Sequence, residues 1–425
     1  MAPKALGMQP VTLAARRVVI LSGNHLCHNP RAHKEAVTLT QLGYEVQVLG
    51  AWIDRELKEK DRALIAGSSF QFIPVVDFTV HRLNRVAASA KSKVGEVRRR
   101  VLGTTSAWQL GSSIGALKRM ATKTHAKLFV AHSEMGMAVA ADLLMMGRKV
   151  GIDMEDWFSE DLLPEARKRR PLKLLRDLER TLLKHASHRT CTSHAMAEAL
   201  AAKYGCSLPA VVYNAFPWSD RENIDGLVKD RRNLRLRSIH WVSQTLGFGR
   251  GLEDLVTALP LLQYEAEIHL RGRAMPGFAE WLSAQLPSTW RDRVYIHDLV
   301  PNHELLSRIA EHDIGFAGEQ KFCKSRDLTV TNKILQYLLG GLAVLASDTA
   351  GQREIAQQAQ RAVHLYHSGN SQGLAAKLNL LLSSPEELVR AKQSAVAAAE
   401  DTFCWEKCAR PLTNSVQMAL CCTQP

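Results

Sequence analysis

The sequence predicts an α/β protein of two doubly wound, Rossmann-like domains that face each other across a cleft. Three observations predict this architecture. At 425 residues the chain is too long for one ordinary hydrophobic core. Strand-like apolar runs alternate with helical patterns in both halves, which is typical of parallel sheets joined by helical crossovers. A polar, charge-mixed stretch at 218–237 separates the two alternations, so we expect one domain over 1–217 and another over 218–399.

The first domain is predicted to begin with a buried strand, "RRVVILSG" at 16–23, and a helix that follows it. In this helix Asn29 is the expected N-cap, Pro30 the first helical residue and Gly43 the end. A second strand then completes a βαβ unit. That second strand occupies 45–52. The later elements are predicted from apolar runs with polar ends, and they are strands at 126–136 and 149–157, a strand and a helix within 188–205, and a strand at 210–217.

The second domain is predicted to contain six strands that alternate with helices. Their apolar runs occupy residues 238–244, 266–272, 294–300, 313–319, 342–348 and 362–368. In doubly wound sheets, ligands bind beyond the carboxyl ends of the strands. Two such sheets in one chain therefore place the ligand site in the cleft between them.

The basic charge of the chain is concentrated in its first half. Residues 1–220 hold 32 Lys and Arg against 20 Asp and Glu, whereas the remainder holds 23 against 22. Much of the excess lies in three runs, at 91–100, 117–127 and 166–176. These runs fit either a solvated face or an attraction to anionic lipid headgroups or an anionic acceptor. Nucleic acid is disfavoured as a partner because aromatic residues are not interleaved with the basic ones.

The sequence shows no sign of a membrane-spanning or secreted protein. No apolar run reaches the roughly 18 residues of a transmembrane helix, and the N-terminus lacks the compact apolar core of a signal peptide. We therefore expect the protein in the cytoplasm or bound peripherally at the inner face of a membrane. The eight cysteines show neither CxxC pairs nor zinc spacing, so we expect free thiols and no structural metal.

The motifs of two common nucleotide-dependent enzyme classes are missing. The first βα turn, "SGNHLCHNPR", is not a GxGxxG fingerprint, and no GxxxxGK[ST] loop occurs. A nicotinamide oxidoreductase and a P-loop enzyme are therefore disfavoured, and no cofactor is expected. No DxD triplet occurs either, so a metal-chelated diphosphate is not favoured. The densest acidic cluster, "DMED" at 153–156, fits the polar end of a strand better than a magnesium site.

A lysine stands at an unusual place in "TVTNKILQYLLGGLAVLASDTAGQREI" (329–355). If a helix begins near Thr331, its free N–H groups and its dipole favour an anion. Lys333 would then put a cation in the first helical turn, where the dipole disfavours it. A bound phosphate would resolve this conflict. The alternative is that Lys333 is simply exposed to solvent.

Five segments follow one another in an order that is specific as a set. They are "HNPRAHKEAVTLTQLGYEVQVL" (28–49), "GIDMEDWFSEDL" (151–162), "VVYNAFP" (211–217), "GRGLEDLVTAL" (249–259) and "NKILQYLLGGLAVLASDTAGQREI" (332–355). Together they resemble the GT-B-fold, group 1 retaining (family 4-like) glycosyltransferases, and residues 400–425 look like the family's terminal helix, which crosses back to the first domain. The resemblance implies transfer of a sugar from a nucleotide-sugar donor to a glycan or lipid-linked acceptor, as in polysaccharide biosynthesis, with retention and without a metal.

The resemblance also implies roles for residues at matching positions. Arg250 stands where the family has a basic residue on the donor diphosphate, and Gln244 where it has a second one. Arg271 or Arg273 would supplement them, and His132 would lie near the donor sugar. The expected catalytic residues are therefore His132, Arg250 and Lys333, and the expected substrate-binding residues are Gly23, Asn24, Arg31, Gln244, Arg271, Asp327, Thr331, Asn332 and Gln336.

The chain departs from the family's pattern at three positions. The family often carries two glutamates eight residues apart, whereas Leu328 and Gln336 stand here, and Met154 replaces a usual histidine. The amide oxygen of Gln336 can still accept a hydrogen bond from a ribose hydroxyl, but without charge assistance. Two alternatives stay open: a binding protein on the same scaffold that has lost catalysis, and a nucleotide-sugar epimerase of the same fold.

Overall fold

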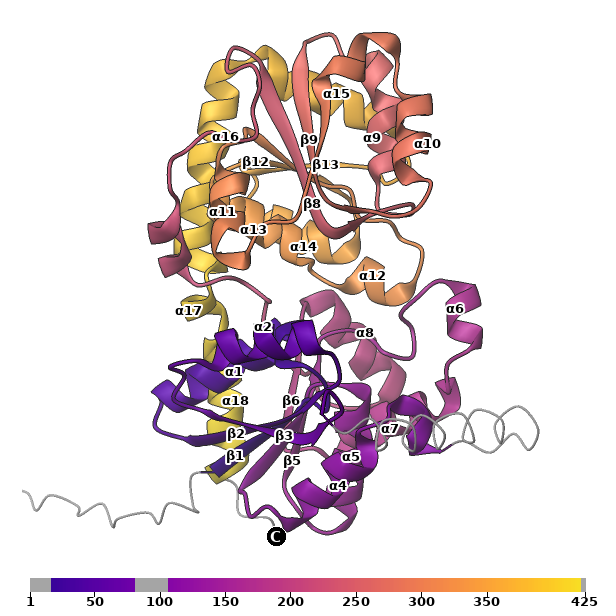
Figure 1. Cartoon of the computed structure of the whole chain (residues 1–425), viewed down its shortest axis with the longest axis vertical. Helices are drawn as coiled ribbons and strands as arrows, with labels where there is room; N and C mark the ends of the chain where they lie inside the picture. The colour runs from indigo at the N-terminus through magenta and orange to yellow at the C-terminus, as the bar shows by residue number, and fades with distance from the viewer. Residues whose placement is uncertain (1–16, 81–105, 422–425) are drawn as a thin grey trace, which may run out of the picture.

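The structure is a computed structural model, and it describes residues 17–80 and 106–421. Within these residues the chain forms two α/β domains, each with a parallel sheet between layers of helices, arranged one above the other in Figure 1. This confirms the predicted fold class. The basic run at 91–100 lies outside the described residues.

The first domain contains a seven-stranded sheet with the order β3-β2-β1-β4-β5-β6-β7, and every neighbouring pair is parallel. The strand order reverses beside β1, so a ligand crevice is expected at the carboxyl ends of β1 and β4. The strands are β1 (Arg17–Leu21), β2 (Glu45–Trp52), β3 (Gln71–Asp77), β4 (Leu128–Ala131), β5 (Val150–Met154), β6 (His188–Cys191) and β7 (Ala210–Val211).

Helices cover both faces of this sheet (Figure 1). They are α1 (Pro30–Gln41), α2 (Arg55–Ile65), α4 (Ile114–Lys123), α5 (Glu134–Met145), α6 (Pro164–Lys168), α7 (Leu172–His185) and α8 (His194–Tyr204), with short 3-10 turns at Leu26–His28 and Ala107–Leu110. Helix α1 begins and ends as predicted. The Asn29 side chain accepts a hydrogen bond from the N–H of Ala32 at 2.9 Å, and Gly43 adopts φ +83° just after the helix.

Strand β3 was not predicted, because Pro74 interrupts its pattern. Proline has no N–H group and is tolerated mainly in edge strands. Here β3 is indeed the edge of the sheet and pairs only with β2 among the described strands.

The second domain contains a six-stranded parallel sheet with the order β10-β9-β8-β11-β12-β13. All six predicted strands are present, as β8 (Arg237–Leu246), β9 (Ala266–Ala274), β10 (Val294–His297), β11 (Ile314–Ala317), β12 (Ala343–Ser347) and β13 (Val363–Tyr366). The helices are α9 (Leu252–Ala258), α10 (Phe278–Gln285), α11 (Asn302–Ala310), α12 (Lys324–Leu328), α13 (Asn332–Gly340), α14 (Ala350–Gln358), α15 (Ser371–Ser383) and α16 (Pro385–Ala398).

Side chains alternate between the two faces of each sheet, which gives each domain two hydrophobic cores. In β1, Val18 and Ile20 belong to one buried cluster, and Val19 and Leu21 belong to the other. The stretch predicted as a linker, 218–237, packs on the second domain. It begins with a 3-10 turn (Trp218–Asn223), from which Arg221 donates to the carbonyl of Leu339 in α13.

The C-terminal segment crosses back to the first domain through α17 (Trp405–Cys408) and α18 (Arg410–Cys421), drawn in yellow in Figure 1. Beside the crossing, the N–H of Trp405 donates to the carbonyl of Phe216 at 2.9 Å, so the outgoing and returning chains lie together. The indole N–H of Trp405 donates to the hydroxyl of Thr38 in α1 at 2.8 Å. Lys34 of α1 lies 4.6 Å from the centre of the Trp405 ring, a cation–π contact.

Among the described helices none is both long and apolar enough to cross a lipid bilayer. The described cysteines are all free thiols.

Candidate functional site

The segments that follow the carboxyl ends of both sheets meet between the domains. After β5, the N–H of Trp157 donates to the hydroxyl of Ser325 at 3.0 Å, and the N–H of Ser325 donates to the carbonyl of Glu160 at 3.3 Å. Lys324 lies 4.6 Å from the centre of the Trp157 ring. Helix α12 of the second domain therefore docks on the loop after β5. The carboxyl edges of the sheets, where Rossmann-like domains bind ligands, face each other.

Two further contacts bring α13 and α14 to the domain boundary. The Glu354 carboxylate of α14 accepts from the N–H groups of His194 and Ala195, each at 3.1 Å, and so caps α8 of the other domain. The side chain of Asn214, just after β7, donates to the side chain of Asn332 at 3.0 Å. Because Asn332 is the first residue of α13, this bond fixes the start of that helix at the boundary.

Three cations surround one carboxylate there. Lys333 Nζ lies 2.6 Å from Glu319 Oε1 and 5.3 Å from the centre of the Trp241 ring. Burial raises the pKa of the Glu319 carboxyl, but the charges of Lys333, Arg326 and Arg250 outweigh burial and hold the pKa below its ordinary value. The positive charges of Lys333, Arg326 and Arg250 thus gather around Glu319, and Arg326 Nε also lies 3.6 Å from the Asp161 carboxylate. Such a gathering of cations suits the binding of an anion.

Two turns that touch each other at glycines hold this cluster together. Arg250 follows β8, and its guanidinium donates to the Ser243 hydroxyl at 2.9 Å. The next residue, Gly251, adopts φ +80°, and a Cβ there would collide with the carbonyl oxygen of Gly318. The turn after β8 can pack directly on the turn after β11 only because residue 251 is glycine. This close approach places Arg250 beside Glu319.

Helix α13 begins where it was predicted, but Lys333 is not the isolated cation that the sequence suggested. Asn332 is the first helical residue and Thr331 the N-cap. Lys333 is paired with Glu319, which neutralises it, so the expected conflict with the helix dipole is relieved without a ligand. Within the described chain Thr331 makes no capping bond, and its buried Oγ1 has no hydrogen-bond partner. The first turn of α13 thus keeps N–H groups without a side-chain acceptor.

Arg31 and His132, for which we predicted contacts with the substrates, lie in a buried network instead. Arg31 donates to both carboxylate oxygens of Asp153, at 2.6 and 2.7 Å, and to the carbonyl of Val212 at 2.6 Å. His132 is fully buried, and its Nε2 lies 2.7 Å from the Glu35 carboxylate. Neither side chain is exposed to solvent, and each is already paired with a carboxylate of the protein, Arg31 with Asp153 and His132 with Glu35. This geometry favours a positioning role for Arg31 and His132.

The first βα turn contributes one accessible predicted residue. Gly23 adopts φ +69°, and its N–H donates to the carbonyl of Leu49 at 2.9 Å. Its neighbour Asn24 is exposed just beyond the carboxyl end of β1. In the second domain, Gln244 is exposed beside an irregularity of β8, and Gln336 is half-buried on α13. These side chains are accessible, and their contacts with substrate stay predictions.

Arg271 and Asp327 are occupied by structural contacts, although we predicted substrate contacts for both. Arg271 is 3% exposed and donates to the Asp230 carboxylate and to the carbonyl of Asp298. Asp327 accepts from the N–H of Ala350, the first residue of α14, at 3.0 Å. These contacts favour a role for both residues in holding loops and helix ends, and their predicted contacts with substrate stay predictions.

Several groups at the boundary were missed from the sequence. Glu319 and Arg326 gave no signal, because only the docking of α12 brings Arg326 near Glu319 and Asp161. Glu155 lies within the acidic "DMED" cluster, just after β5. Burial, followed by the charge of Asp156, raises the pKa of the Glu155 carboxyl to about 7. Its position at the carboxyl end of a strand was the signal that could have identified it.

Leu328 stands where the resembled family often has a glutamate, and it serves the domain interface. Its side chain packs against the hydrophobic core of the first domain. Its carbonyl accepts from the hydroxyl of Ser193, the N-cap of α8, at 2.5 Å. Position 328 therefore joins the domains and offers no polar side chain to a ligand.

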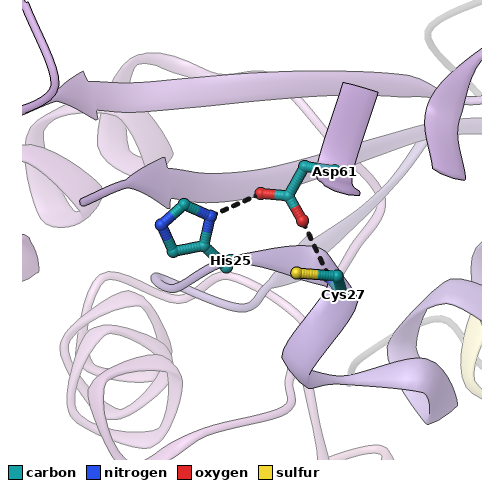
Figure 2. A group of neighbouring side chains, drawn as sticks. All are labelled: His25, Cys27 and Asp61. Atoms are coloured by element: carbon teal, nitrogen blue, oxygen red, sulfur yellow. Dashed lines mark hydrogen bonds and ion pairs between the residues drawn. The ribbon is translucent and has the colours of Figure 1, made fainter. Parts of the chain in front are cut away.

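One cluster of metal-ligand residue types occurs in the described chain, formed by His25, Cys27 and Asp61 (Figure 2). The N–H groups of Ile53 and Asp54 donate to His25 Nε2 at 2.8 and 3.1 Å, so Nδ1 carries the ring proton and donates to Asp61 at 2.7 Å. The other Asp61 oxygen accepts from the N–H of Cys27 at 2.7 Å. Burial and the Asp61 carboxylate raise the pKa of the Cys27 thiol to about 12. These bonds engage both ring nitrogens of His25 and both carboxylate oxygens of Asp61, and they explain the cluster as a loop anchor.

Comparison with known structures identifies the fold. Anabaena HepE in complex with UDP superposes with a TM-score of 0.67 at 17% identity, over 94% of this chain and 99% of that one. WaaG, a glycosyltransferase involved in lipopolysaccharide biosynthesis, gives 0.57 at 14% identity over 94% and 99%. A UDP-N-acetylglucosamine 2-epimerase assigned in Listeria monocytogenes gives 0.54 at 12% over 95% and 96%. No family model and no curated protein sequence matches the chain. With its two facing parallel sheets and returning C-terminal helix, the chain has the GT-B fold.

Proposed function

We propose that this protein is a glycosyltransferase that moves a sugar from a nucleotide-sugar donor to a glycan or lipid-linked acceptor. The observation that carries the proposal is the cluster of Arg250, Arg326 and Lys333 beside the uncapped start of α13. It lies at the carboxyl edge of the second sheet, between the two domains. Support comes from structures of the same fold, since HepE is described in complex with UDP, with UDP and glucose, and with UDP-glucose.

The chemistry of the proposed reaction fits these residues. Cleavage of a sugar–diphosphate bond develops negative charge on the leaving group, which Arg250, Lys333 and the first turn of α13 would stabilise in a water-poor site. We propose retention of anomeric configuration, because an acceptor that enters on the leaving-group face needs no pair of catalytic carboxylates. We also propose that no metal takes part, because these cations can balance the diphosphate and the sequence has no DxD triplet. Turnover that survives a chelator would support this point.

In this proposal some of the remaining predicted residues contact the substrates, and one positions its surroundings. Thr331 and Asn332 would contact the diphosphate from the start of α13, and Gln336 the ribose. Asn24 would contact substrate from the first domain. Through Glu35 and Asp153, His132 would position the loops around the donor sugar rather than touch it.

A thermal-shift screen with UDP-, GDP- and ADP-sugars tests the proposed function. A ligand that binds only the folded protein raises its melting temperature. A donor found in this way is then incubated with the protein, and release of the nucleoside diphosphate is followed. If no nucleotide-sugar shifts the melting temperature or is turned over, the proposed function is wrong.

Arg250→Ala is expected to weaken binding of the nucleoside diphosphate by about 1.5–3 kcal/mol, the usual size of a hydrogen bond to a charged group. The reason is the place of Arg250 beside Lys333 and Glu319, where a diphosphate would lie. Isothermal titration with UDP and GDP measures the effect. Arg291→Ala removes an exposed arginine of the same domain and is the matched control. An unchanged dissociation constant for Arg250→Ala would remove this residue from the donor site.

An epimerase acting on a nucleotide-sugar is the second candidate, favoured by the structural similarity to the Listeria monocytogenes protein. The two activities leave different products. An epimerase returns the sugar still attached to its nucleotide, whereas a transferase releases the nucleoside diphosphate. A protein that binds the donor but produces neither would be a scaffold that has lost catalysis, as Leu328 and Gln336 allow.

We further propose that the basic first half of the chain attracts an anionic membrane surface or an anionic acceptor. Lys118, Arg119 and Lys123 of α4 are exposed, and the run at 166–176 spans α6 and the start of α7. Sedimentation with anionic vesicles is expected at low salt and should be lost at high salt, since exposed charges are screened within about 10 Å at 0.1 M. Zwitterionic vesicles are the control. Without binding at low salt, the charge serves a soluble acceptor or solubility.

A further inference from the structure

We propose that Glu319 is a built-in competitor of the donor diphosphate, whose carboxylate occupies the cationic site of the free protein and thereby sets the affinity for nucleotide. This inference rests on the proposed function and adds a specificity-determining residue to it. In sequence, Glu319 lies in the turn after β11, 14 residues before the lysine that it meets.

The contact itself is close and sheltered. Glu319 Oε1 lies 2.6 Å from Lys333 Nζ, and the side chains are only 12% and 15% exposed. Burial raises the pKa of the Glu319 carboxyl, but the charge and hydrogen bond of Lys333, with smaller contributions from Arg326 of α12 and Arg250 of the turn after β8, hold that pKa below its ordinary value. Glu319 is therefore an anion at neutral pH, and it sits among the same cations that a diphosphate would need.

The site has more donors than one carboxylate satisfies. An ammonium group offers three N–H donors, and the one carboxylate paired with Lys333 in the described part of the chain is Glu319. The start of α13 has no capping side chain there, and the buried Oγ1 of Thr331 has no partner. A phosphate could bind the Lys333 ammonium and the N–H groups at the start of α13 together, whereas Glu319 is paired only with Lys333. The surplus distinguishes an anion site from an ordinary salt bridge.

The backbone around Glu319 is held, so that exchange needs only a movement of the side chain. The Ser347 hydroxyl donates to the carbonyl of Glu319 at 2.6 Å, and Gln352 in turn donates to Ser347 Oγ at 2.8 Å. On the other side, Gly251 packs against Gly318. A diphosphate can therefore take the place of the carboxylate while the loop stays where it is.

Removal of the Glu319 charge should strengthen binding of a nucleoside diphosphate. A bound diphosphate must now displace the carboxylate from Lys333 and then lie near it, and like charges a few ångströms apart repel each other strongly in a partly buried site. We expect Glu319→Gln to bind UDP or GDP about tenfold more tightly than the natural protein, the modest end of such an effect. Glu280→Gln removes the same charge from an exposed position of α10 and should change nothing.

Isothermal titration of the full-length chain with UDP and GDP tests the inference. The gain in nucleotide affinity from Glu319→Gln should disappear when Lys333→Gln is added, because the ammonium group for which carboxylate and diphosphate compete is then absent. Equal or weaker binding by Glu319→Gln, with the natural protein still binding nucleotide, overturns the inference and makes Glu319 a residue that orients Lys333. Binding by the variant alone would support it. If neither protein binds any nucleotide, the proposed function fails and this inference fails with it. Glu319→Ala provides a second variant if the glutamine lowers the melting temperature.

Discussion

Arg31→Met is expected to lower the free energy of unfolding by about 3–5 kcal/mol, the usual cost of removing one partner from a buried ion pair. Arg31 is 2% exposed, and it binds both carboxylate oxygens of Asp153. Without the guanidinium, the buried Asp153 carboxylate keeps only the hydroxyl of Thr190, at 2.5 Å, and His132, whose Nδ1 lies 3.4 Å away. Urea unfolding followed by circular dichroism measures the loss.

Two comparisons separate this structural role from the predicted substrate contact. Arg180→Met removes an arginine from an exposed pair with Asp177 and should cost less than about 1 kcal/mol. The double variant Arg31→Met/Asp153→Leu should recover part of the stability, because replacing a buried ion pair by apolar groups is often nearly neutral. If Arg31→Met instead unfolds like Arg180→Met while substrate binding is lost, Arg31 contacts the substrate, as the sequence suggested.

The fold could be predicted from the sequence because its signals are local. Asn29, Pro30 and Gly43 mark the ends of α1 through backbone preferences that act within a few residues, and the structure confirms all three. In the second domain, β11 and β12 are short, almost wholly apolar runs, as expected for strands buried on both faces. Strand β3 was not predicted, because Pro74 contradicts the local strand signal. Proline is acceptable there only because β3 lies at the edge of the sheet.

The candidate site was harder to predict, because its charges find partners that are distant in the chain. Arg31 and Asp153 are 122 residues apart, and each looks like a free ligand-binding group until the sheet brings them together. Lys333 looked isolated because its partner, Glu319, belongs to another element. A sequence pattern identifies which residue types stand at the carboxyl ends of strands. The fold decides which of their charges remain available to a ligand.

The second domain also contains a buried group of histidines that no sequence pattern indicated. His240 and His312 stack with ring centres 4.5 Å apart, and His269 lies 4.6 Å from His312 and 5.2 Å from His297. They come from β8, β9, β10 and the turn before β11, and the nearest charged groups are Asp230, Arg231, Glu267 and Arg271. Both ring nitrogens of His240 are buried without a hydrogen-bond partner in the described chain.

Burial, helped by the proximity of the other positive groups, holds the pKa of these imidazoles below the ordinary 6.5. The pKa of His240 lies well below that value, the pKa of His269 falls to about 2, and those of His297 and His312 are also lowered. Below pH 6.5 the unfolded chain therefore binds protons that the folded chain does not. Acid then stabilises the unfolded state. The folded protein therefore has its full stability, as far as these histidines are concerned, above pH 6.5, and it loses stability as the pH falls. Asp230 cannot offset this loss, because its own pKa is depressed and it stays ionised throughout the window.

The second domain is accordingly expected to lose stability steeply between about pH 6.5 and pH 5, since each such histidine contributes up to about 1.4 kcal/mol per pH unit. Urea unfolding at pH 5, 6 and 7.5 measures how steeply the free energy of unfolding falls with pH.

His132 in the first domain acts in the opposite direction, because Glu35 and Asp153 raise its pKa despite burial. The test therefore needs a variant of the second domain. His240→Phe keeps an aromatic ring stacked on His312 and removes one titrating group, and it should reduce the slope by up to about 1.4 kcal/mol per pH unit. His303→Phe, at a side chain that is 79% exposed, is the matched control and should leave the slope unchanged. A slope that is the same in His240→Phe as in the natural protein would show that His240 opens to solvent and titrates as it does in the unfolded chain.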